Sequence, residues 1–231
     1  RILTGERVAL SPFVPDVVAH LRKIKSMADK NVKKANKILF IVGLVFILIG
    51  QLILAKGNDF VYNQEPIDFA HWFLLVGVTL LIPQTVTFPK KIYSLIGIPL
   101  TLIGIVCIIG MCVLDFIWWS FPNQEMRNEF TYHISHVPSI WKPFMAIGPS
   151  SKVFNLGLLL LSLNYTKTGK IGIVLVLIAN LILWHIIPLP FRLVLGYAIT
   201  LIGFSIILLR ENNENVLQQS VLFPNSATIR K

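Results

Sequence analysis

The chain has 231 residues, of which 55% are hydrophobic and only 14% are charged, and its formal net charge is +10. The chain is therefore more apolar and less charged than a typical water-soluble globular domain. Backbone polar groups in lipid need partners within a helix or a closed barrel, and long continuous apolar runs do not fit the alternating strands of a barrel. The sequence therefore predicts an all-α integral membrane protein, in a cell or organelle membrane.

A basic segment, residues 1–37, precedes the first long apolar run and carries nine Lys and Arg residues. Each cation near a membrane surface gains about 1 kcal/mol from anionic headgroups, so we expect anionic lipids as partners of this segment. No groove-reading motif accompanies the basic residues, so nucleic acid is not an expected partner. Three interpretations stay open for residues 1–26: an amphipathic element, a processed leader remnant or a non-native addition.

Six apolar segments are predicted to cross a bilayer as a single bundle, residues 38–209, because about 20 helical residues span roughly 30 Å of hydrocarbon. They lie at 38–56, 68–88, 92–117, 147–166, 171–187 and 190–209. The fourth is the weakest, because its continuous apolar part, residues 153–165, is too short to span alone. A re-entrant segment is the alternative for that part of the chain.

The distribution of basic residues predicts the orientation of the bundle. With the N-terminus in the cytoplasm, 16 of the 21 Lys and Arg residues fall on the cytoplasmic side. The positive-inside rule then favours an N-in/C-in topology. Residues 210–231 become a cytoplasmic tail, and residues 118–146 become an amphipathic extracytoplasmic loop between the third and fourth helices.

Pairs of glycines seven residues apart recur in three of the predicted helices. Such glycines lie on nearly one helix face and let a neighbouring helix approach closely. An alternative is that two of the pairs mark inverted repeats of the kind found in transporters. The pairs are Gly43 and Gly50, Gly97 and Gly104, and Gly196 and Gly203.

Four of the five histidines fall on the predicted extracytoplasmic side. Imidazole is a ligand for zinc, copper and haem iron, so this group is a candidate metal or haem site. Its members are His71, His133, His136 and His185. The competing interpretation is structural, because His, Trp and Tyr side chains are common at the membrane–water interface.

Four further polar residues are candidates for ion pairs or proton chemistry. Asp68 lies three residues before His71, so its carboxylate can orient the imidazole or cap the helix. Asp115 lies within a predicted membrane segment, where ionisable groups are costly and often functional. Arg192 is a candidate counter-ion for Asp115 or for an anionic headgroup, and Asn180 is expected to form a hydrogen bond between helices.

The chain contains no Walker loop, GxSxG elbow, HExxH helix or dinucleotide fingerprint. We therefore expect a non-enzymatic subunit of a membrane complex or a lipid-interacting protein, with other membrane subunits or further copies of the chain as partners. The alternative is a membrane enzyme or redox subunit with a His/Asp metal or haem site at the extracytoplasmic face. A small transporter is the third hypothesis.

Overall fold

The computed structural model describes residues 13–222 of the chain, and it describes side chains from residue 24 to residue 210. Within this part, the chain forms helices and no strand. Four helices are long and apolar enough to cross a membrane, and a bent pair raises the number to five if it counts as one span. The described residues are thus compatible with a helical membrane bundle, as predicted.

The elements follow one another with short connections. In chain order they are α1 (Phe13–Leu54), α2 (Asn58–Tyr62), α3 (Phe69–Thr87), α4 (Ile92–Ser120), α5 (Gln124–Ser135), α6 (Pro138–Ile140), the π-helix η1 (Trp141–Ile147), α7 (Gly148–Ser150), α8 (Lys152–Ser162), the 3-10 helix η2 (Leu163–Tyr165), α9 (Lys170–Leu183) and α10 (Arg192–Leu222).

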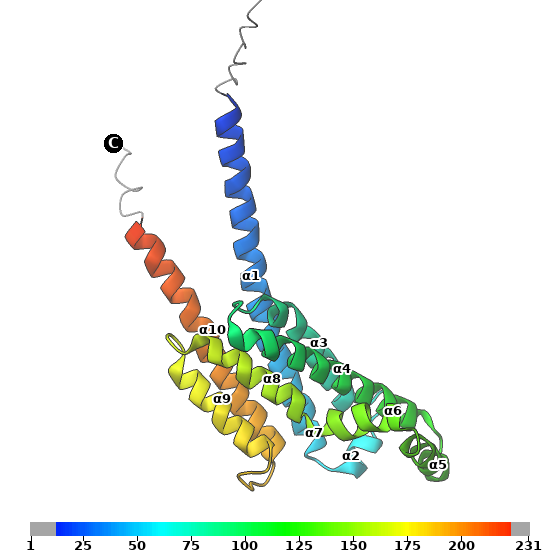
Figure 1. Cartoon of the computed structure of the whole chain (residues 1–231). Helices are drawn as coiled ribbons and strands as arrows, with labels where there is room; N and C mark the ends of the chain where they lie inside the picture. The colour runs from blue at the N-terminus through cyan, green and yellow to red at the C-terminus, as the bar shows by residue number, and fades with distance from the viewer. Residues whose placement is uncertain (1–12, 223–231) are drawn as a thin grey trace, which may run out of the picture.

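The basic segment and the first apolar run form one continuous helix, α1. No Gly or Pro interrupts residues 16–42, so nothing in the chain favours a break at the polar–apolar boundary. The predicted domain boundary at residue 37 therefore lies inside a helix. Figure 1 shows the N-terminal part of α1 projecting beyond the bundle, at the same end as the C-terminal part of α10.

Glycines allow the backbone of α1 to lie in close contact with that of α3, and the backbone of α9 with that of α10. A Cβ atom on Gly77 of α3 would lie 2.9 Å from the carbonyl oxygen of Gly43 on α1. Likewise, a Cβ atom on Gly172 of α9 would lie 2.5 Å from the carbonyl oxygen of Gly203 on α10. Real side chains do not fit at such distances, so both of these close helix contacts, which we call glycine seams, depend on glycine.

The third seam joins α4 to α8. A Cβ atom on Gly104 would lie 2.6 Å from Cβ of Phe154, and one on Gly157 would lie 2.5 Å from the backbone nitrogen of Thr101. Each of the three glycine pairs seen in the sequence thus contributes to one helix pair. The prediction of close packing is confirmed, and the inverted-repeat alternative stays a prediction.

The fourth and fifth predicted crossings are less regular than the others. The segments Pro138–Ser150 and Lys152–Tyr165 are long and apolar enough to cross a membrane only when they are taken together. The angle between them is 53°. α9 has 14 residues and ends at Leu183 rather than at the predicted residue 187. Pro188 and Pro190 follow within one to two turns, and proline does not continue a helix because it lacks the backbone N–H.

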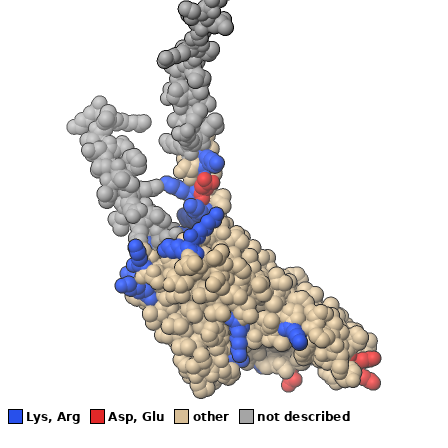
Figure 2. Space-filling view, viewed as in Figure 1, with Lys and Arg blue, Asp and Glu red and all other residues tan. Residues whose placement is uncertain are grey.

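Charge is distributed unequally over the two ends of the bundle. Figure 2 shows most of the visible Lys and Arg gathered at the end from which α1 projects, whereas Asp and Glu are visible at both that end and the end that carries α5 in Figure 1. Exposed cations in the first region come from α1, from the connections before α4 and α9, and from the first residue of α9. They include Lys30, Lys33, Lys34, Lys90, Lys167 and Lys170.

Candidate functional site

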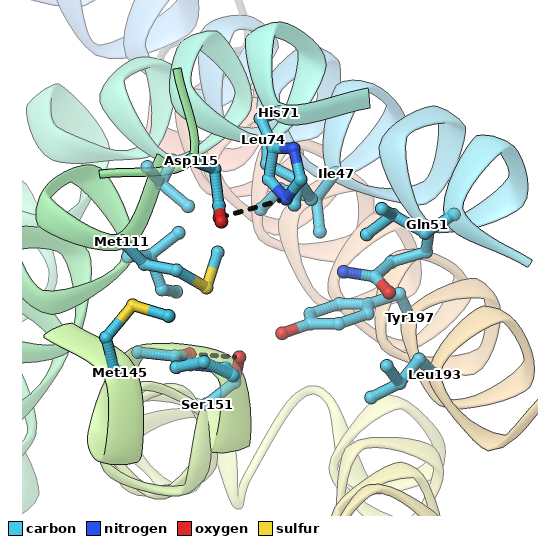
Figure 3. Close-up of a pocket in the computed structure, with 15 residues that line it drawn as sticks. Ile47, Gln51, His71, Leu74, Met111, Asp115, Met145, Ser151, Leu193 and Tyr197 are labelled. Carbon is cyan, nitrogen blue, oxygen red and sulfur yellow. Dashed lines mark hydrogen bonds and ion pairs between the residues drawn. The ribbon is translucent and has the colours of Figure 1, made fainter. Parts of the chain in front are cut away.

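A cavity of about 230 Å³ lies at the α5 end of the bundle, among α1, α3, α4, α10 and the bent segment from η1 to α8. Most of its lining is apolar, including Ile47 of α1, Leu74 of α3 and Leu193 of α10. Met111 of α4 and Met145 of η1 also line it, and Figure 3 shows both on the side away from Gln51 and Leu193. Flexible thioether side chains adapt to occupants of different shape.

Three ionisable side chains form a hydrogen-bonded cluster on one wall, which we call the Asp–His–Asp cluster (Asp68, His71 and Asp115). Asp68 is the N-cap of α3, where its Oδ1 accepts a hydrogen bond from the backbone N–H of His71 at 3.1 Å. Its Oδ2 lies 2.5 Å from Nδ1 of His71. On the other side of the ring, Nε2 of His71 lies 3.1 Å from Oδ2 of Asp115 on α4.

The number of protons in this cluster sets its charge. A neutral imidazole has one N–H, so two contacts between ring nitrogens and carboxylates require a second proton. That proton makes either an imidazolium between two carboxylates or a neutral imidazole beside one carboxylic acid. Both arrangements carry a net charge of −1, so a proton can move within the cluster without changing the charge of the cavity.

The Asp115 carboxylate of the cluster also affects the pKa of Tyr62, which lies in α2 at the edge of the bundle. Burial raises the pKa of the Tyr62 phenol above its ordinary value, and the Asp115 carboxylate adds to the rise. The Arg127 guanidinium acts in the opposite direction. An anion disfavours a neighbouring phenolate and a cation favours it, which accounts for the two opposite directions.

The opposite wall carries polar groups from other helices. Gln51 of α1 is 8% exposed, and its Oε1 has no hydrogen-bond partner among the described residues. Tyr197 of α10 is 2% exposed, and Figure 3 shows its hydroxyl directed into the cavity toward Ser151. An unpaired buried acceptor costs about 1–3 kcal/mol, so Gln51 favours an occupant that donates a hydrogen bond.

A second cavity of about 290 Å³ adjoins the first one. Gln51, Leu54 and Leu193 line both, so these side chains form a wall that the two cavities share. The second cavity is also lined by His185 and Arg192. Arg192 donates a hydrogen bond from Nη1 to the carbonyl oxygen of Leu183 at 2.7 Å.

Unusual backbone conformations lie around these cavities. In the described residues, three non-glycine residues have positive φ: Ser151 at 50°, His185 at 65° and Phe191 at 51°. Ser151 lines the first cavity, and the other two line the second. Left-handed conformations cost about 1–2 kcal/mol for such residues, and they gather at functional sites when the surrounding structure holds them in place.

The predicted polar residues divide into two groups. Asp68 both caps the helix and holds His71, as its spacing indicates, and Asp115 completes the cluster. The expected ion pair between Asp115 and Arg192 is not formed, because His71 is the partner of Asp115. Asn180 donates to the carbonyl oxygen of Val176 one turn earlier in α9, rather than to another helix as expected.

The structure does not bring the four candidate metal-binding histidines together. His71 is held by two carboxylates, and His133 and His136 lie at the end of α5. Nδ1 of His136 lies 2.8 Å from the carbonyl oxygen of Tyr132, and His185 lies between α9 and α10. Among the residues described here, no group of three or more His, Cys, Asp or Glu is arranged to hold a metal ion. The metal or haem site stays a prediction.

Sequence reasoning missed the polar residues of the opposite wall. Gln51 carried a signal, because it is an isolated amide at the end of an apolar run. Tyr197 and Ser151 carried none, since each has an ordinary role at a membrane interface or a helix end. Their participation depends on the packing of α10 and of the bent segment against α1 and α4.

No protein-family model, curated protein or solved structure matches this chain. Its function has to be argued from the chemistry of the cavities, since a helical bundle alone does not specify an activity.

Proposed function

We propose that this chain is a six-crossing membrane protein, with both termini in the cytoplasm, that binds a membrane lipid in an extracytoplasmic cavity. One observation carries the proposal: a hydrogen-bonded Asp–His–Asp cluster forms the polar wall of an otherwise mostly apolar cavity. Pockets of this kind orient an apolar ligand through a few polar groups.

The topology draws support from the order of the helices. α1, α3, α4, α8, α9 and α10 run alternately up and down the bundle in Figure 1. α9 extends about 21 Å at 1.5 Å per residue, less than the hydrocarbon thickness. The connection that follows it contains further apolar residues, Ile186, Ile187, Leu189 and Phe191, that extend the apolar depth.

Labelling of single cysteines from one side of the membrane tests the six crossings. Cys107 and Cys112 are buried and are replaced by Ala to give a background without thiols. In sealed cells, an impermeant maleimide should label Pro188→Cys, at an exposed position of the connection between α9 and α10, at once and Thr166→Cys only after permeabilisation. Equal labelling of both variants from outside would show that α9 does not cross.

Lipid binding agrees better with the structure than binding of another subunit through the glycine faces. A partner helix would pack closely on such faces, but Gly43, Gly104 and Gly203 pack against helices of the same chain. The cavity, in contrast, has unfilled volume and an unpaired acceptor. Association with other subunits through other surfaces stays a proposal.

Blocking the cavity tests the proposed function. Met145→Trp places a large ring where Figure 3 shows the Met145 side chain pointing into the cavity. The control is Met126→Trp, at an exposed position of α5 outside it. Mass spectrometry of the detergent-purified proteins should find near-stoichiometric lipid in the wild type and the control. We expect at least about tenfold less in Met145→Trp, since a filled pocket loses most of its contact area. Equal lipid in all three proteins would contradict the proposal.

A second candidate function is acid–base chemistry by His71, in a membrane enzyme or a proton-coupled transporter. The specific observation is that Asp68 holds Nδ1 at 2.5 Å while Nε2 is directed to Asp115 at the cavity. A carboxylate in that position fixes the tautomer of a general base. Conversion or proton-coupled movement of the bound lipid that disappears in His71→Gln, with lipid still bound, would establish this role.

A further inference from the structure

The two adjoining cavities have opposite charge, and this selects among lipids. We infer that they form one bipolar site for a phospholipid with a primary ammonium and a phosphate diester, the ethanolamine class. The ammonium occupies the first cavity, between Asp115 and Gln51, and the phosphate binds Arg192 in the second. The inference rests on the proposed lipid binding and adds the chemical identity of the headgroup.

The first step is that the two cavities share a wall, which is the ground for assigning one headgroup to both. Gln51, Leu54 and Leu193 line the first cavity on one side and the second on the other. Gln51 therefore lies at the junction, with its unpartnered Oε1 buried there. A headgroup with two polar ends has contacts available on both sides of this side chain.

The second step concerns the negative end. The Asp–His–Asp cluster carries a net charge of −1, and Asp115 is its most exposed member, with 26% of the side chain accessible. A primary ammonium matches this charge and has three N–H donors, which also suit the unpaired Oε1 of Gln51. A quaternary ammonium has the charge but no donor, and a glycerol headgroup has donors but no charge.

The third step concerns the positive end. Arg192 lines the second cavity, and neither Asp nor Glu does. A guanidinium has five N–H donors, and the hydrogen bond from Nη1 to the carbonyl oxygen of Leu183 leaves others for a ligand. Planar N–H pairs match phosphate oxygens in a bidentate geometry, so a phosphate diester suits this position.

The surroundings of the second cavity suit acyl chains. Phe191 is 67% exposed and Leu189 is 39% exposed, and both line the cavity. Leu52, next to Gln51 on α1, is 48% exposed. These apolar side chains continue from the polar site to the lipid-facing surface, so a bound headgroup keeps its chains in hydrocarbon.

The experiment titrates delipidated, detergent-solubilised protein with three phospholipids of equal chain length and measures binding by native mass spectrometry. The headgroups are ethanolamine, choline and glycerol. For the wild type we expect ethanolamine lipid to bind about tenfold more tightly than the other two, because charge-assisted hydrogen bonds are roughly twice as strong as neutral ones.

Two variants separate the two ends of the site. Asp115→Asn should abolish the preference for ethanolamine over glycerol lipid. Arg192→Gln should weaken all three lipids by a similar factor, about tenfold, since each contains the phosphate. Asp59→Asn and Lys142→Gln, which lie outside both cavities, serve as matched charge controls and should bind like the wild type.

The outcomes distinguish the inference from the proposal beneath it. If none of the lipids binds, the proposed function itself fails. If all three bind equally, or if Asp115→Asn keeps the ethanolamine preference, lipid binding stands and the bipolar site is wrong. Should Asp115→Asn fail to fold, Gln51→Leu tests the same end, because it removes the acceptor and should reduce the preference for ethanolamine over choline lipid.

Discussion

The glycine seams and the Asp–His–Asp cavity lie on the same helices and show opposite ways of using helix spacing. On α1, Gly50 packs against Leu74 and the carbonyl oxygen of Ala70, while the next residue, Gln51, lines the cavity. On α4, Gly104 contacts α8, and Asp115 forms the cavity wall three turns later. Where small residues bring backbones together, no space remains for a ligand. Where the helices do not approach so closely, a mostly apolar cavity with polar groups on its walls remains.

The largest expected effect is a substitution in a seam. Gly104→Leu should lower the free energy of unfolding by about 3 kcal/mol, because its side chain would overlap the Phe154 backbone. Thermal unfolding in detergent, followed by tryptophan fluorescence, measures the change. Val106→Leu on the lipid-facing side of the same helix is the control and should change stability little. If Gly104→Leu were as stable as the wild type, the close contact between α4 and α8 would not depend on a small residue at this position.

A smaller effect is expected for Asp68, which both caps α3 and holds the ring of His71 beside the cavity. Asp68→Ala should destabilise the protein by about 1–2 kcal/mol, because the cap of α3 and the bond to His71 are lost together. Asp68→Asn keeps an oxygen for the cap, so its destabilisation should be about half as large. The same unfolding assay compares the two variants. Equal losses would mean that Asp68 acts on His71 alone.

The smallest expected effect is a gain in stability combined with a loss of lipid binding. Phe191→Gly should raise the free energy of unfolding by about 0.5 kcal/mol, because glycine adopts φ near 51° without strain. The same change removes an apolar side chain from the second cavity, so less lipid should be retained. Unfolding and lipid mass spectrometry on one sample measure both quantities. If stability and lipid content fell together, the conformation of Phe191 would not be a feature of a binding site.

Part of the candidate site could be predicted from local spacing. Asp68 and His71 are three residues apart at a helix start, so geometry within a single turn brings them together. The contact between His71 and Asp115 could not be predicted, because it depends on how α3 and α4 lie against each other. The same reason explains why Arg192 and Asp115 do not pair, although both lie at the same end of the bundle.

The sequence by itself determined the helical class, the main apolar segments and the glycine faces, because these follow from backbone hydrogen bonding and from side-chain volume along one helix. It did not determine that α9 stops at Leu183, that the segment around Ser151 bends by 53°, or that Gln51 and Tyr197 face the Asp–His–Asp cluster. Those features were decided by the tertiary structure. A cavity is the space left between several helices, and its shape depends on all of their packing contacts at once.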